Sequence, residues 1–393
     1  MYDIILAFIT AFTLTYFAIP SIIKVARIKN LCDEPGERRS HTVSTPSLGG
    51  VAIFAGVIFS IILWTPFNVF GDLQYILCAF IIIFLVGARD DIVPVSPTYK
   101  LIAQIFATSI LVFKSNVVIT SMYSLFGIGD LNMFVSYALS IFTILVIINA
   151  FNLIDGINGL SGSIGTLISV TFGTWFIMID RLELAIIAFT LAGSTIAFLK
   201  YNVTPAKIFM GDTGSLLLGI VCSILAIKFL EWNKSIMALS EYSHLRPFAV
   251  KSVPAVAIGI MILPLFDTLR VFIMRAMRGR SPMSPDRNHI HHLLIDFGFT
   301  HMKATGILVM VNTVFIVMAL NLQSLGSFNL IALILFLATS LTGMLFFAVR
   351  QKRIAANKST LSPTSAPSAI EVRSNNTTGK GLVQRDAQNA NKE

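Results

Sequence analysis

Long apolar stretches alternate with short polar segments along almost the whole chain of 393 residues. A helix needs about 20 mainly apolar residues to cross the hydrocarbon core of a bilayer, and eleven runs approach or reach that length. They cover residues 4–23, 48–67, 73–88, 99–113, 132–151, 160–179, 184–199, 214–231, 254–273, 304–321 and 328–349. The pattern therefore predicts an all-α, polytopic membrane bundle of about eleven transmembrane helices.

The composition agrees with a membrane protein. Hydrophobic residues make up 55% of the chain and charged residues 12%, and the mean hydropathy is +0.79. A soluble domain has about twice that share of charged residues. Lys24, Arg27 and Lys29 follow the first apolar run instead of preceding it, which is not the order of a cleaved signal peptide. We expect this first segment to stay in the membrane.

The composition changes after Arg353 to Ser, Thr, Asn, Ala and Lys, with few large apolar residues. Such a segment buries too little apolar surface to fold by itself. We therefore expect a transmembrane domain over residues 1–350 and a disordered, basic and polar cytoplasmic tail over residues 351–393.

The basic residues predict how the bundle is oriented, because Lys and Arg are retained in cytoplasmic loops. When loops are assigned to alternate sides, only six of the 29 basic residues fall on the side opposite loop 24–47. These six are Lys114, Arg181, Lys228, Lys234, Arg246 and Lys251. The N-terminus is predicted outside and the C-terminus inside.

Charge and cysteine usage exclude several classes of protein. The net charge of +9 lies in juxtamembrane loops, which favours anionic headgroups and phosphorylated ligands over nucleic acid. Cys32, Cys78 and Cys222 are far apart and form neither a disulfide framework nor a zinc motif. No internal repeat of the kind found in many transporters is visible.

Five dense polar segments all fall on the predicted cytoplasmic face. They are "RRSHTVSTPSLGG" (38–50), "GARDDIVPVSPTYK" (87–100), "NAFNLIDGINGLSG" (149–162), "KYNVTPAKIFMGDTGS" (200–215) and "RGRSPMSPDRNHIHHLL" (278–294). The opposite loops carry charges but no comparable cluster of Asp, Asn, His and Gly. One cytoplasmic site built from five loops explains this distribution.

The carboxylates and amides of these loops suit a divalent cation and phosphates. Asp90 and Asp91 are adjacent at the end of the third apolar run, and Asp212 lies in a Gly-flanked turn where backbone NH groups can hold phosphate. Asn152, Asp155 and Asn158 recur every three residues and would share one face of a helical turn. Oxygen ligands of this kind suit Mg²⁺, which binds through one or two carboxylates plus substrate phosphates.

Two alternatives stay open for these residues. Asn, Asp and Gly are common at the ends of helices, so each cluster taken alone is also explained by helix capping. In the segment "DRNHIHH", Arg287, His289, His291 and His292 offer donors to phosphate and sugar oxygens. A zinc site there would need further ligands, and no Cys lies nearby.

Four of these motifs resemble one known family. "GARDD", "NAFNLIDGINGL", "KIFMGDTGS" and above all "SPDRNHIHHLL" look like the motifs of the polyprenyl-phosphate N-acetylhexosamine-1-phosphate transferases, most of all those acting with GlcNAc and undecaprenyl phosphate in bacteria. The resemblance covers residues 20–350. It implies a multi-span bundle in the bacterial inner membrane with a cytoplasmic site.

The resemblance also implies roles for individual residues. Asp212 and Asn152 match the metal ligands, and Asp90 and Asp91 match the paired catalytic aspartates, whose separate roles it does not distinguish. The remaining positions match residues that bind the substrates, and Phe209 among them matches an aromatic that stacks on uracil. They are Lys100, Asn152, Asp155, Asn158, Asn202, Phe209, Arg287, His289, His291 and His292. Close bacterial relatives commonly carry Asp at position 158, where this chain has Asn.

The implied activity is transfer of an N-acetylhexosamine 1-phosphate from a UDP-sugar to undecaprenyl phosphate, with release of UMP. Mg²⁺, or Mn²⁺ in its place, is the implied cofactor. Membrane lipid is an implied partner and nucleic acid is not; the oligomeric state is open. A related enzyme acting on UDP-MurNAc-pentapeptide has a different histidine segment. A transporter would carry polar groups near mid-span, whereas these lie at one membrane face.

Overall fold

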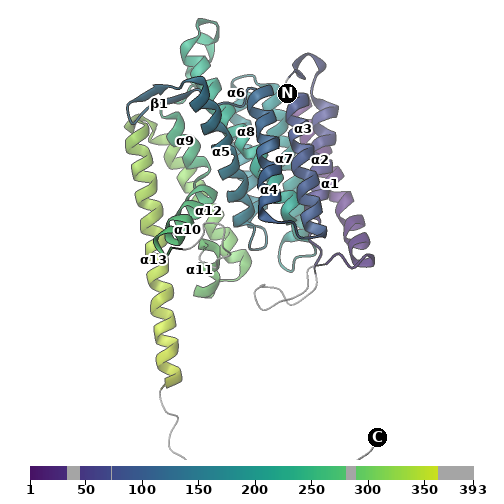
Figure 1. Cartoon of the computed structure of the whole chain (residues 1–393), viewed down its shortest axis with the longest axis vertical. Coiled ribbons are helices and arrows are strands. Elements are labelled where there is room, and N and C mark those ends of the chain that lie inside the picture. The colour runs from purple at the N-terminus through teal and green to yellow at the C-terminus, as the bar shows by residue number, and fades with distance from the viewer. Residues whose placement is uncertain (33–44, 72, 280–288, 362–393) are drawn as a thin grey trace, which may run out of the picture. The chain divides into compact units, whose positions relative to one another are not determined.

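A computed structural model of the chain describes residues 1–32, 45–71, 73–279 and 289–361, the last six of them by their backbone alone. Most of this part is helical (Figure 1). The α-helices are α1 (Tyr2–Ile28), α2 (Gly49–Trp64), α3 (Leu73–Ile92), α4 (Pro97–Lys114), α5 (Met133–Ile154), α6 (Leu160–Met178), α7 (Leu182–Asn202), α8 (Gly211–Ala238), α9 (Val253–Ile260), α10 (Ile262–Met277), α11 (Ile290–Phe297), α12 (His301–Asn321) and α13 (Ser327–Leu361). Short 3₁₀ turns are η1 (Phe67–Val69), η2 (Ser240–Phe248) and η3 (Gln323–Leu325).

Each of the eleven predicted apolar runs overlaps a helix or, in one case, a broken helix pair. Among the described residues, seven helices are long and apolar enough to cross a membrane, and the pair α9–α10 makes an eighth if it counts as one span. The all-α membrane fold is thereby confirmed. The count of eleven spans and the orientation in the membrane stay predictions.

The chain divides into two units, Met1–Val349 and Arg350–Glu393. Helix α13 continues to Leu361, beyond the position at which the tail was expected to begin. Residues 362–393 of the expected tail lie outside the described part of the chain. The proposed boundary near residue 350 is therefore still a prediction.

Helix α8 forms the centre of the first unit. Of its most apolar 18-residue window, 89% is buried, compared with 22% for α13. It packs against α2, α3, α5 and α6 (Figure 1). Gly219 allows the close approach of α5, because a Cβ at this position would lie 2.5 Å from the Cα of Ile148. The first turn of α8 carries Asp212, so the central helix also positions the candidate site.

The ninth predicted span is broken. Helices α9 and α10 meet at an angle of 84° at Met261. Pro264 has no NH to donate to the carbonyl of Ile260 four residues earlier. Asn312 of α12 replaces that bond, because its Nδ2 donates to Ile260 O over 3.1 Å while its Oδ1 accepts from Leu263 N over 3.2 Å. The break therefore keeps its buried backbone groups hydrogen-bonded.

A small antiparallel hairpin, β1 (Ser121–Leu125) and β2 (Ile128–Asp130), lies between α4 and α5. The helical pattern did not predict it. The carboxylate of Glu231 accepts from Thr120 N at 2.9 Å and Thr120 Oγ1 at 2.8 Å, and Lys234 pairs with Asp130 at 2.8 Å. These contacts fasten the hairpin to the C-terminal part of α8. In Figure 1, β1 lies toward the upper end of the first unit and α11 toward its lower end.

Candidate active site

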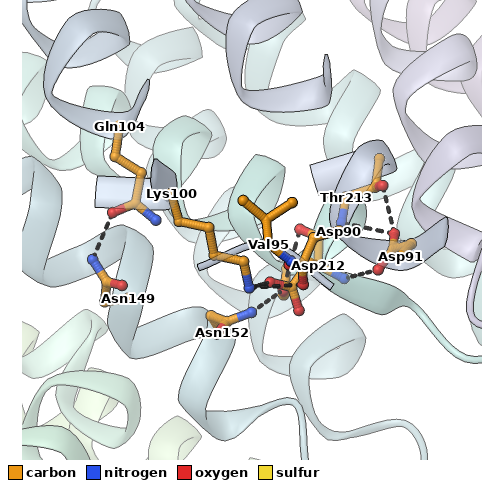
Figure 2. Close-up of polar contacts among 10 residues, drawn as sticks. Asp90, Asp91, Val95, Lys100, Gln104, Asn149, Asn152, Asp212 and Thr213 are labelled. Atoms are coloured by element: carbon orange, nitrogen blue, oxygen red, sulfur yellow. Dashed lines mark hydrogen bonds and ion pairs between the residues drawn. The ribbon is translucent and has the colours of Figure 1, made fainter. Parts of the chain in front are cut away.

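Lys100 joins two aspartates that come from different helices. Its Nζ lies 2.8 Å from Asp90 Oδ2, near the end of α3, and also contacts Asp212 Oδ2, at the start of α8. The other oxygen of Asp90 accepts from Val95 N over 2.7 Å and closes the turn between α3 and α4 (Figure 2). Two carboxylates and one ammonium group therefore converge, which leaves a net negative charge at this centre.

Asp91 points to a different partner from its neighbour. Its carboxylate accepts from Asp212 N at 2.6 Å, Thr213 N at 3.1 Å and Thr213 Oγ1 at 2.5 Å (Figure 2). The first NH groups of a helix have no partner within the helix. Asp91 therefore caps α8 from a separate helix. Burial raises the pKa of its carboxyl group to about 7, against these hydrogen bonds, and the ionised form lies where the helix dipole favours negative charge.

The start of α8 requires glycine. Gly211 has φ +72°, and a Cβ there would lie 2.6 Å from both carboxylate oxygens of Asp91. The segment preceding it pairs with the start of α2 in an extended arrangement. Phe209 N donates to Pro46 O over 2.8 Å, and Gly49 N donates to Phe209 O over 2.9 Å. These backbone bonds fix the position of Phe209 and, next to it, the turn that carries Asp212.

A cavity of about 220 Å³ opens beside this centre. Four segments line it: Ser47 just ahead of α2, the end of α5 with the loop that follows, the end of α7, and the start of α8 with the residues that precede it. The lining residues are Ser47, Asn152, Asp155, Gly156, Ile157, Asn158, Asn202, Phe209, Met210, Gly211 and Asp212. Six predicted site residues thus share one cavity although they come from three segments of the chain.

Asn152 and Asp212 are placed to act together. Asn152 Nδ2 donates to Ser215 Oγ over 3.0 Å, which leaves the amide oxygen of Asn152 as an acceptor. Deeper in the bundle, Gln104 Oε1 accepts from Asn149 Nδ2 over 2.9 Å. In the described part of the chain no three His, Cys, Asp or Glu side chains converge as a metal cage. Carboxylate and amide oxygens beside an open cavity fit Mg²⁺, which takes the rest of its ligands from substrate and water.

Several polar groups of the cavity wall are already hydrogen-bonded to other groups of the protein. Asn202 accepts from Gly159 N over 2.6 Å and donates to Ile208 O over 2.8 Å, so its amide joins the wall segments. Asn158 Nδ2 donates to Thr204 Oγ1 over 2.9 Å. Burial raises the pKa of Asp155 to about 7, against the hydrogen bond that it accepts from Ser161. The wall therefore carries a buried carboxyl group whose ionised form is disfavoured by burial.

The histidine segment is held by an aspartate that the sequence analysis did not select. Asp267, in α10, accepts from Ile290 N over 2.9 Å, and its other oxygen lies 2.8 Å from His289 Nδ1. Arg270 Nη2 lies 3.3 Å from Asp267. A single carboxylate inside the predicted span 254–273 is itself a functional signal in a membrane protein. That signal was available in the sequence.

His291 lies against the wall of the cavity. It is buried, and a Cβ at Gly156 would overlap its Nε2. Burial, with a smaller contribution from the neighbouring His292, lowers the pKa of His291 to about 3, so the neutral ring is favoured at physiological pH. The rings of His289 and His291 are stacked with centroids 5.6 Å apart. The histidines do not line the cavity itself and support its wall from behind.

The predicted residues thus occupy three adjacent places. Asp90 and Lys100 form the charged centre with Asp212, which also lines the cavity alongside the Asn and Asp residues and Phe209. His289 and His291 lie behind the wall, and His292 is next to His291 with ring centroids 4.3 Å apart. Arg287 lies outside the described residues.

Known proteins resemble this chain along most of its length. Residues 73–230 match the model of glycosyl transferase family 4. The probable undecaprenyl-phosphate N-acetylglucosaminyl 1-phosphate transferase of Bacillus subtilis is 31% identical over 349 residues, which are 86% of this chain and 91% of the relative. The decaprenyl-phosphate N-acetylglucosaminephosphotransferase of Mycolicibacterium smegmatis is 27% identical over 77% of this chain and 78% of its own length.

A third relative has a comparable sequence identity to this chain. The undecaprenyl-phosphate alpha-N-acetylglucosaminyl 1-phosphate transferase of Yersinia pestis is 28% identical over 72% of this chain and 74% of its own length. Because of this match and these relatives, the chain belongs to the polyprenyl-phosphate N-acetylhexosamine-1-phosphate transferases of glycosyl transferase family 4 and is a phosphoglycosyltransferase.

Proposed function

We propose that this protein transfers N-acetylglucosamine 1-phosphate from UDP-N-acetylglucosamine to undecaprenyl phosphate and releases UMP. The single observation that carries the proposal is the meeting of the Asp90, Lys100 and Asp212 centre with a polar cavity at the ends of apolar helices. A water-soluble nucleotide and a lipid phosphate can both reach such a position. The relatives named above are described as enzymes acting with N-acetylglucosamine and polyprenyl phosphate.

In the proposed reaction, an oxygen of the lipid phosphate attacks the β-phosphorus of the donor. The bond between this phosphorus and the oxygen bridging to the α-phosphate breaks, and UMP leaves with that oxygen. The product is undecaprenyl diphosphate carrying N-acetylglucosamine. Asp90 orients the lipid phosphate and accepts its proton, while Lys100 provides positive charge to the phosphate oxygens. Most of the acceleration in this chemistry comes from positioning and electrostatics.

The wall residues bind the donor in this proposal. Phe209 stacks on the uracil ring, and Asn158 binds the base with the amide atoms that its bond to Thr204 leaves available. Asn202 holds the wall segments together through its two hydrogen bonds. Asp91 holds the turn of Asp212 by capping α8. Asp212 and Asn152 would hold Mg²⁺, or Mn²⁺, which when bound would neutralise negative charge on the diphosphate.

The cellular setting follows from the substrates. We place the enzyme in the bacterial inner membrane with its site on the cytoplasmic face, where UDP-sugars are made. Undecaprenyl diphosphate N-acetylglucosamine would then start a cell-surface glycan such as O-antigen.

The test is an assay of the purified protein with UDP-N-acetylglucosamine, undecaprenyl phosphate and Mg²⁺. We expect stoichiometric UMP and a lipid-linked diphosphate sugar, both lost on chelation and in Asp212→Asn. Asp130→Asn, the same change in the distant hairpin, should leave turnover intact. Turnover with UDP-MurNAc-pentapeptide or another donor alone would overturn the choice of sugar. Uptake of solute into liposomes without UMP release would indicate a transporter.

A further inference from the structure

Asp267 stands out among the buried charges because no step of the proposed reaction uses it. It lies in α10 and is 1% exposed, and it is not among the residues that line the cavity. Its two oxygens are directed at two adjacent residues: Oδ2 at the His289 ring and Oδ1 at the backbone NH of Ile290. One carboxylate therefore fixes both the side chain of His289 and the direction in which α11 begins.

The contacts of Asp267 also determine which ring nitrogen of His289 carries a proton. An ionised carboxylate can only accept hydrogen bonds. Ile290 N and Arg270 Nη2 both approach Oδ1, so the bond to Oδ2 is left for His289. His289 must then donate from Nδ1, whether the ring is neutral or charged.

His289 is connected to the cavity through a stack of rings. The planes of His289 and His291 are 10° from parallel, and His291 lies directly against Gly156 in the cavity wall. The wall is also held from α12, because Thr305 Oγ1 donates to Asn158 O over 2.8 Å. A rotation of His289 would therefore change the packing of the His291 ring, whose Nε2 side packs against the wall at Gly156.

We propose that Asp267 is a positioning residue that orients His289 and, through the stack with His291, holds the wall loop 155–158 in the shape that binds the donor nucleotide. This role rests on the proposed function, since it assigns the cavity to the UDP-sugar. Asp267 touches neither substrate and acts only through the histidine segment.

The first measurement concerns the protonation of the wild-type protein and needs no turnover. In protein labelled with ¹⁵N-histidine, the resonances of His289 are assigned by their loss in His289→Gln. We expect Nδ1 to be protonated. In Asp267→Asn, the amide oxygen is needed by Ile290 N, so the NH₂ group faces His289 and the proton moves to Nε2. An unprotonated Nδ1 in the wild type would overturn the proposal, even if Asp267→Asn does not fold.

The second measurement is binding of UDP-N-acetylglucosamine and of UMP, by calorimetry in the presence of Mg²⁺. We expect Asp267→Asn and His289→Gln each to weaken binding of the donor by about tenfold, the loss typical of one charge-assisted hydrogen bond. Combining the two changes should cost little more than either alone, because they break the same connection. The KM for undecaprenyl phosphate should not change.

Thr268→Val is the matched control, because Thr268 is the buried neighbour of Asp267 in α10 and does not contact the histidine segment through any described bond. It should bind the donor as the wild type does. Equal losses in Thr268→Val and Asp267→Asn, or losses that add fully in the double variant, would reduce Asp267 to a packing role and overturn the proposal. A wild-type protein that binds no UDP-sugar would overturn the proposed function. The protonation of His289 would still show whether Asp267 determines which nitrogen of that ring carries the proton.

Discussion

At the scale of single residues, two adjacent aspartates have different surroundings. Asp90 pairs with Lys100, whereas Asp91 caps α8 with three accepted hydrogen bonds. Asp90→Asn keeps the bond from Val95 N and removes only the charge, so kcat should fall by about 10² or more, as for a lost general base. Its thermal unfolding should stay close to that of the wild type.

Asp91→Asn should behave in the opposite way. Its NH₂ group would face backbone donors at the start of α8, and losing a cap costs about 0.5–2 kcal/mol of stability. We expect a lower Tm in detergent and a loss of turnover that follows from the displaced Asp212. Measuring Tm and kcat for both variants separates the roles. An Asp91→Asn protein with the wild-type Tm, or an Asp90→Asn protein with full turnover, would contradict this assignment.

The buried ring of His291 makes stability depend on pH. Its pKa is lowered to about 3 by burial, compared with about 6.5 for histidine in an unfolded chain. Between these two values only the unfolded chain binds the proton, so the free energy of unfolding decreases as the pH falls below about 6.5, by up to about 1.4 kcal/mol per pH unit. This loss is absent above that pH.

His291→Gln should remove this part of the acid sensitivity. We expect the fall in Tm between about pH 7.5 and about pH 5.5 to be smaller in this variant than in the wild type. His244, exposed in η2, provides the control, and His244→Gln should keep the wild-type dependence. An identical fall in Tm for all three proteins would mean that the pKa of His291 is the same in the folded and unfolded chain, against this prediction.

At the scale of elements, the break between α9 and α10 depends on one side chain. Asn312 is buried and satisfies both Ile260 O and Leu263 N. Asn312→Leu would leave two buried backbone groups unpaired, each costing about 1–3 kcal/mol. We expect a markedly lower Tm and weaker donor binding, because α10 carries Asp267.

Asn321→Leu is the control for that experiment, since Asn321 lies in the same helix, is exposed, and bonds only within its own turn. It should leave the Tm nearly unchanged. A similar Tm for both variants would show that the break is held by packing and not by Asn312.

Helix positions were predictable because apolar segments in a bilayer have few ways to satisfy their backbone groups. The break at Met261 was not predicted, although Pro264 lies in the run, because the side chain that replaces the lost backbone bond is Asn312, 52 residues after Ile260. The convergence of Asp90, Lys100 and Asp212 beside a polar cavity was predictable from polar segments clustered at helix ends, while their chemistry stays a prediction. The different directions of Asp90 and Asp91 were not, because they depend on what α4 and α8 place beside each carboxylate. Asp267 was missed because it lies inside a predicted apolar span, outside the five dense polar segments.

At the scale of the whole molecule, the proposed chemistry requires one orientation in the membrane. Helix α8 has 28 residues and is about 42 Å long, more than the hydrocarbon core of a bilayer, so its two ends must lie on opposite sides. The loop before it holds Lys207, next to the site, and η2 after it holds Ser240. Both residues are exposed. The distribution of Lys and Arg predicts that Lys207 faces the cytoplasm and Ser240 the periplasm.

This orientation can be measured with single cysteines at the two positions, after Cys32, Cys78 and Cys222 are replaced. In spheroplasts, a membrane-impermeant maleimide should label Ser240→Cys directly and Lys207→Cys only after the membrane is permeabilised. Labelling of both after permeabilisation controls for accessibility. If Lys207→Cys alone reacted from outside, Asp90 and Asp212 would face a compartment without UDP-sugars. The proposed donor and the predicted cytoplasmic location of the site and of all five polar segments would then be wrong together.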